Sequence, residues 1–115
     1  MPKGYRYEVM LRKELEKNGF LVIRSAGSFF IDLICIRNGE VCLIEIKSSR
    51  NKTHYLSKRC REQLKELKKA EAYGAKSFYA VWFKNKGWKI IKANPEIKKV
   101  ELDTPDVNNL FISQK

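Results

Sequence analysis

The sequence has few of the residues on which many small folds depend. Its 115 residues include only 3 cysteines, 3 prolines, 6 glycines and 1 histidine. Cys35, Cys42 and Cys60 lack the paired C-x-x-C spacing of zinc sites, so we expect no structural zinc and no disulfide framework. No apolar run approaches the ~20 residues of a membrane span, and residues 1–6 lack an apolar signal core. We therefore expect a cytoplasmic protein with no membrane partner.

Acidic residues are also scarce in this chain. There are 13 Asp+Glu against 24 Lys+Arg, which gives a formal net charge of +11. Such an excess of positive charge predicts a polyanionic partner, nucleic acid before an anionic membrane surface. With 43% hydrophobic and 11% aromatic residues, disorder is excluded as the main state. The length predicts a single domain over residues 1–115, in which 104–115 form a weakly structured tail.

Hydrophobic periodicity predicts a layered α/β domain with the element order α-β-ββ-α-ββ. The polar and basic segment 49–57 is expected to be a mobile loop. The expected helices cover 5–18 and 58–73, and the expected strands cover 20–24, 29–37, 40–48, 77–83, 88–92 and 99–102.

The most informative stretch is a predicted β-hairpin. Asn38-Gly39 is a strong two-residue turn signal between two β-rich runs. Symmetric pairing about this turn places Cys35 opposite Cys42, and Asp32 directly opposite Glu45 at a non-hydrogen-bonded position. Lys47 shares the sheet face of Glu45, because side chains alternate with a period of two.

Two carboxylates side by side in apolar strands need compensation. One carboxyl group could be protonated, Lys47 could form an ion pair, or a divalent cation could lie between the acids. A site built from oxygen donors suits Mg²⁺ or Mn²⁺ rather than zinc. Two alternatives remain open: both acids lie at strand ends in solvent, or a bulge at Gly39 shifts the register by one residue.

The spacing Asp32…Glu45-Ile46-Lys47 resembles the PD-(D/E)xK nuclease signature. Its surroundings resemble the archaeal Holliday junction resolvases of the Hjc type. That resemblance implies a restriction-endonuclease-like α/β fold with a central mixed five-stranded sheet flanked by helices. The further segments that carry it are Lys3-Gly4-x3-Glu8, Gly19-Phe20-x3-Arg24-Ser25-Ala26-Gly27-Ser28-x3-Asp32, Gly87-Trp88 and Asn94-Pro95.

The resemblance also implies the roles of the site residues. Glu8, Asp32, Glu45 and the backbone carbonyl of Ile46 would hold one or two Mg²⁺ ions, for which Mn²⁺ substitutes. Lys47 would orient or activate the attacking water and balance the phosphate charge. The alternative for Glu8 is a favourable charge near a helix N-terminus.

Arg24 and Ser28 would contact the scissile phosphate on the same resemblance. The alternatives are an exposed strand-end base for Arg24 and ordinary loop chemistry for Ser28. Phe29 and Phe30 stand where the family commonly has polar or basic residues. Exposed, they would wedge against unstacked bases of the DNA. Packed in the core, they would only begin a strand.

The implied function is a structure-selective endonuclease that resolves four-way DNA junctions by paired symmetric nicks, without a small-molecule cofactor. Two symmetric cuts require a C2 homodimer. The helix stripe of Cys60, Leu64 and Leu67 and the strand 78–83 are candidate interfaces. Another PD-(D/E)xK nuclease, restriction-like or for repair, and a non-catalytic nucleic-acid-binding protein remain alternatives. The candidate phosphate contacts are Lys3, Arg6, Arg24, Arg50, Lys52, Lys58, Arg59 and Arg61.

Overall fold

The protein was analysed as a computed structural model, which describes residues 4–25 and 31–111. No helix among these residues is long and apolar enough to cross a membrane. The elements follow the predicted order, with one added strand that pairs with the strand expected at 99–102. They are α1 (Tyr5–Lys17), β1 (Leu21–Arg24), β2 (Leu33–Arg37), β3 (Glu40–Ser49), β4 (Thr53–Tyr55), α2 (Lys58–Lys68), the 3-10 helix η1 (Lys69–Tyr73), β5 (Lys76–Phe83), β6 (Gly87–Lys92), β7 (Lys99–Glu101) and the 3-10 helix η2 (Asn108–Leu110).

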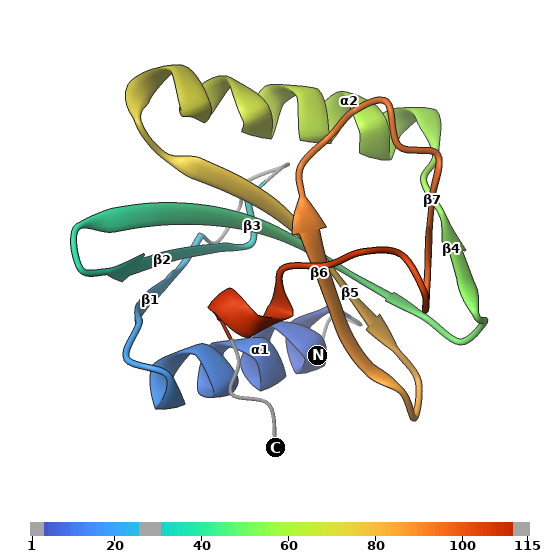
Figure 1. Ribbon diagram of the computed structural model, residues 1–115, viewed down its shortest axis with the longest axis horizontal. Coiled ribbons are helices and arrows are strands. Elements are labelled where there is room, and N and C mark those ends of the chain that lie inside the picture. The colour runs from blue at the N-terminus through green and yellow to red at the C-terminus, as the bar shows by residue number, and fades with distance from the viewer. Residues whose placement is uncertain (1–3, 26–30, 112–115) are drawn as a thin grey trace.

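The central sheet is mixed and five-stranded, as expected. Its strand order is β1-β2-β3-β5-β6, and only β3 and β5 run parallel. Parallel neighbours need a long crossover, and α2 forms it. Figure 1 shows α1 on one face of the sheet and α2 on the other. The apolar runs of β3 and β5 are therefore covered on both faces, which explains why they do not alternate with polar residues.

Two apolar clusters fill the space between the sheet and the helices. On the α1 face, Leu11 and Leu15 pack with inward residues of the sheet such as Ile44 and Phe78. On the α2 face, the cluster contains the stripe Cys60, Leu64 and Leu67 and the β5 residues Tyr79, Val81 and Phe83. Both candidate dimer interfaces of the sequence analysis are thus used inside the domain.

The β2–β3 hairpin confirms the predicted register. Asn38 (φ 53°) and Gly39 (φ 79°) both have left-handed backbone conformations, as a two-residue hairpin turn requires. Pairing then runs outward to Leu33 opposite Ile44, with Cys35 opposite Cys42. No bulge shifts the register over these pairs.

The segment 49–57 is not the mobile loop that was expected. β3 continues to Ser49, and Thr53–Tyr55 forms β4, which pairs antiparallel with β7. The second helix is also shorter than predicted: α2 ends at Lys68 and continues as the 3-10 helix Lys69–Tyr73, before Gly74 at φ 94°. β7 lies within the expected strand 99–102, whereas no local pattern marks Thr53–Tyr55, which is short and pairs only with this distant segment.

The start of the expected C-terminal tail is ordered. Phe111 is 2% exposed and packs against Phe20 and Phe78 in the α1-face cluster. Asn108 accepts the backbone N–H of Ile90 at 2.6 Å. Residues 104–111 are therefore attached to the domain through Phe111 and Asn108, which differs from the expectation of a weakly structured tail for this segment.

The turn gives a first testable prediction. Replacing Gly39 by Ala should lower the free energy of unfolding by about 1–2 kcal/mol, because a left-handed backbone crowds a Cβ against the following carbonyl. No other atom lies within 4 Å of the added Cβ, so the backbone cost is isolated. Urea titration would measure it. Gly4→Ala is the matched control, at φ −74°. An equal effect of the two substitutions would contradict this account of the turn.

Candidate active site

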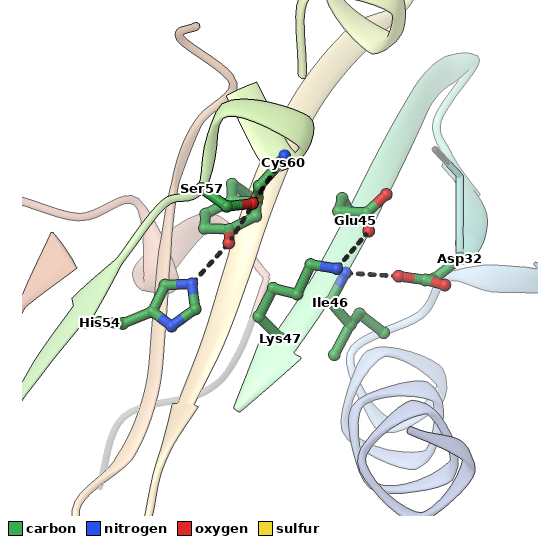
Figure 2. A network of polar contacts seen from close by, with 8 residues as sticks. Asp32, Glu45, Ile46, Lys47, His54, Ser57 and Cys60 are labelled. Carbon is green, nitrogen blue, oxygen red and sulfur yellow. Dashed lines mark hydrogen bonds and ion pairs between the residues drawn. The ribbon is translucent and has the colours of Figure 1, made fainter. Parts of the chain in front are cut away.

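Asp32 lies where β2 stops pairing with β3. Its backbone N–H donates to Ile44 O at 2.9 Å, and its carboxylate Oδ2 accepts the backbone N–H of Ile46 at 2.6 Å (Figure 2). The Asp32 carboxylate thus accepts the Ile46 N–H, which a backbone carbonyl would have accepted if β2 and β3 had continued to pair. Burial raises the pKa of Asp32, against the lowering effects of the Ile46 hydrogen bond and the nearby Lys47.

Glu45 is the buried member of the acid pair. It projects from the middle of β3 and is 4% exposed. Burial, followed by the charge of Asp32, raises the pKa of Glu45 to about 7, although Lys47 acts in the opposite direction. The charge of Asp32 therefore acts on Glu45, as expected for two neighbouring carboxylates. The pairing of β2 with β3 ends one residue earlier, at Leu33 opposite Ile44.

Lys47 lies two residues farther along β3 on the face of Glu45. Its Nζ is 3.3 Å from Glu45 Oε1, and its side chain is 35% exposed. The ion pair with Glu45 thus holds the ammonium group in place, while part of the Lys47 side chain remains accessible to solvent. Figure 2 shows Glu45 and Lys47 on β3 and Asp32, just before β2, with its carboxylate directed toward β3. A phosphate at this opening would meet a fixed positive charge.

The second oxygen of Glu45 tests whether the pair suits a cation. Oε2 is buried and has no hydrogen-bond partner within the part of the chain that the structure describes. A buried anionic oxygen without a partner is costly, whereas a hard divalent cation prefers such an oxygen. The donor set fits Mg²⁺ or Mn²⁺, and the Lys47 ion pair alone leaves the charge incompletely compensated.

Glu8 does not join the two acids directly. Its Oε1 accepts a hydrogen bond from Arg24 Nε at 2.7 Å, and the Arg24 guanidinium also lies over the Tyr5 ring. The pair still borders the site, because the Ser25 backbone N–H donates to Asp32 O at 3.1 Å. Over residues 4–25 and 31–111 no group of three His, Cys, Asp or Glu side chains is positioned to hold a metal.

A polar network of Tyr79, His54 and Cys60, which the sequence did not predict, lies near Lys47. The Tyr79 hydroxyl lies 2.6 Å from His54 Nε2 and 3.1 Å from Cys60 Sγ. Burial raises the pKa of Tyr79, and burial followed by the charge of Lys47 lowers the pKa of His54. Tyr79 is the β5 partner of Glu45 in the parallel register. No turn defines that register, so the sequence carries no local signal for it.

The other predicted contacts are distributed around this centre. Ser28, Phe29, Phe30 and Lys3 lie outside the described residues. Arg61 is half-buried, and its Nε has no hydrogen-bond partner among the described residues. The remaining candidates are exposed: Arg6, Arg24, Arg50, Lys52, Lys58 and Arg59.

Comparison with known proteins identifies the family. The model of the archaeal Holliday junction resolvase (Hjc) family matches residues 1–109. This chain belongs to that family. The acid pair, Ile46 and Lys47 therefore lie within the part of the chain that matches a family of Holliday junction resolvases.

Two relatives show how far the family likeness extends. The chain is 43% identical over 81 residues to a crossover junction endodeoxyribonuclease Hjc of Methanocaldococcus jannaschii, covering 70% of this chain and 59% of that protein. The chain thus spans less than two thirds of that relative. The solved structure of Hjc, a Holliday junction resolvase of Archaeoglobus fulgidus, superposes with a TM-score of 0.75 at 26% identity, over 94% of both chains.

The unpartnered oxygen of Glu45 generates the second prediction. In EDTA at pH 8, Glu45→Gln should raise the free energy of unfolding by roughly 1–3 kcal/mol. The reason is that a folded-state pKa near 7, above the ordinary 4.5, makes the ionised group destabilising above pH 7. Chemical denaturation would measure the gain. Glu62→Gln, at an exposed position of α2, should change stability little. A destabilised Glu45→Gln protein would contradict the view that this carboxylate is strained.

Proposed function

We propose that this protein is a divalent-metal-dependent DNA endonuclease that resolves four-way junctions in recombination and repair by paired symmetric nicks. Family membership gives the class of substrate. The observation that carries the chemistry is the buried oxygen Oε2 of Glu45, which has no partner among the described residues, whereas Oε1 pairs with Lys47. A protein that only binds DNA gains nothing from two carboxylates in a strongly basic domain.

Asp32, Glu45 and the backbone carbonyl of Ile46 would hold Mg²⁺, with Mn²⁺ as a substitute, and Glu8 would join after release from Arg24. When bound, such an ion lowers the pKa of a water and offsets charge on a phosphate. Lys47 keeps a positive charge where the phosphate gains negative charge, because its ion pair with Glu45 fixes the ammonium group. Arg24, freed from Glu8, would bind a phosphate oxygen.

Recognition of the junction rests on phosphate contacts in this proposal. The exposed basic residues Arg6, Arg50, Lys52, Lys58 and Arg59 can all reach solvent-facing phosphates. No element of the described structure is shaped to read base edges in a groove, so shape rather than sequence would select the substrate. Binding would then weaken steeply as salt increases.

We also infer a homodimer, because one domain carries one site and resolution needs two symmetric cuts. The surface that suits it is an apolar patch on β1 and β2, here called the β1–β2 patch. Leu21 is 62% exposed and Ile23 is 44% exposed. Their cross-strand partners Ile36 and Ile34 add to the same face. An apolar patch on a sheet edge is otherwise a site of uncontrolled association.

The third prediction concerns cleavage. With Mg²⁺, the protein should nick a synthetic four-way junction symmetrically and leave a linear duplex of the same sequence largely intact. Asp32→Ala and Glu45→Ala should each lower the rate at least about 100-fold, since each removes a carboxylate that would hold the metal ion. In addition, Mg²⁺ should raise the melting temperature of the wild type and not that of Glu45→Gln.

Asp103→Ala removes an exposed acid remote from the site and is the control for cleavage. Equal cutting of linear duplex would favour a restriction-like or repair nuclease of the same superfamily. No Mg²⁺-dependent cleavage of any DNA would leave only the non-catalytic binding role.

The fourth prediction concerns assembly. Replacing Leu21 and Ile23 together by Glu should convert a dimer into a monomer, because like charges would face each other across the two-fold axis. Light scattering coupled to size exclusion at micromolar concentration measures the mass. Tyr73→Glu is the control, at a side chain 92% exposed and outside the patch. A dimer that persists in the double variant would rule out this interface.

A further inference from the structure

A basic groove lies next to the site on the α1 side of the sheet. It has a cavity volume of about 930 Å³ and is bounded by the start of α1, the end of β3 and the β5–β6 hairpin. Four cationic side chains line it, and the indole of Trp82 forms part of its wall. The cations are Arg6, Arg50, Lys84 and Lys86.

The charge of this groove is uncompensated. No acidic side chain is among its lining residues. None of its four cations forms an ion pair within residues 4–25 and 31–111, whereas elsewhere Lys76 pairs with Glu40 and Lys89 with Asp106. Four like charges around one hollow repel each other, so the groove favours a bound polyanion.

The cations of the hairpin are held on a rigid support. The Lys84 backbone N–H donates to Ser49 O at 3.0 Å, which ties the hairpin to the end of β3. Lys86 N–H donates to Phe83 O at 2.9 Å across the turn. At the base of the hairpin, Trp82 and Trp88 pack edge to face with their ring centroids 5.3 Å apart. The backbone of the hairpin is therefore already ordered before a ligand binds.

The groove shares two elements with the candidate active site but opens on the other face of the sheet. Ser48, which lines it, follows Lys47 on β3, so their side chains point to opposite faces, and Arg6 precedes Glu8 by two residues on α1. Residues two apart on a helix point to nearly opposite sides. The first turn of α1 therefore directs Glu8 toward Arg24 and Arg6 toward the groove.

We propose that this groove binds the sugar–phosphate backbone of one arm of the DNA, with Lys84 and Lys86 as phosphate contacts and Trp82 packed against the sugars. The proposal rests on the nuclease function proposed above and adds the β5–β6 hairpin to its DNA-binding surface. A free phosphate would occupy only a small part of this volume, whereas a backbone presents a series of anions to a row of cations.

The test is a salt titration of binding without cleavage. The probe is a fluorescent synthetic four-way junction in EDTA, measured by anisotropy over a range of NaCl concentrations. For Lys84→Ala/Lys86→Ala, the slope of log Kd against log[NaCl] should fall by about 2 for each protomer on the junction, and so by about 4 for a dimer, because each phosphate contact releases roughly 0.9 counterion. Affinity at low salt should fall about tenfold or more.

Lys13→Ala/Lys65→Ala is the matched control, because it removes the same charge from two exposed lysines outside the groove. Its slope should match the wild type. Equal slopes for both double variants would overturn the proposal, since the effect would then come from net charge alone. Melting temperatures check that both double variants are folded.

A second measurement uses the two tryptophans of the chain. In a Trp88→Phe variant, the fluorescence of Trp82 should change when the junction saturates the protein, and an unchanged signal would place the DNA outside the groove. Failure here is separable from failure of the nuclease proposal. Junction cutting with an unaltered salt slope overturns only the groove, whereas groove binding without any cutting overturns only the nuclease.

Discussion

The arrangement of this domain depends on one electrostatic constraint: two carboxylates are held together inside an apolar sheet. Glu45 is almost fully buried, and the charge of Asp32 disfavours ionisation of its carboxyl group. Repulsion between the acids and loss of hydration both disfavour their ionised forms, and one ion pair with Lys47 offsets this only in part. The folded chain therefore carries a charge arrangement that a bound divalent cation would stabilise and that a purely structural ion pair does not explain.

Several parts of the fold are needed to keep that arrangement in place. The hairpin turn at Asn38-Gly39 sets the register that leads Asp32 toward Glu45. The Ile46 backbone N–H then holds the Asp32 carboxylate at 2.6 Å. Burial of the apolar clusters on both faces of the sheet stabilises the fold and offsets the free-energy cost of holding the two carboxylates together. Strain of this kind persists only where the surrounding structure determines the conformation.

Features with local signals were predictable from the sequence. The turn residues give the β2–β3 register, and period-two alternation puts Lys47 on the face of Glu45. Features that depend on distant partners were not predictable. Pairing of β4 with β7 joins segments more than 40 residues apart, and Tyr79 meets Glu45 only through a parallel register without a turn. The Glu8–Arg24 ion pair likewise depends on how α1 docks on the sheet.

The net charge of +11 is unevenly distributed over the folded chain. Some lysines are neutralised by nearby acids on the surface, as Lys76 is by Glu40. The cations around the groove have no such partners in the described structure, and they surround the end of β3 just beyond Lys47. Attraction for a polyanion is therefore concentrated around the end of the strand that carries Glu45 and Lys47. A phosphate that approached the acid pair would do so within this positive field, which would offset in part the repulsion that two carboxylates exert on it.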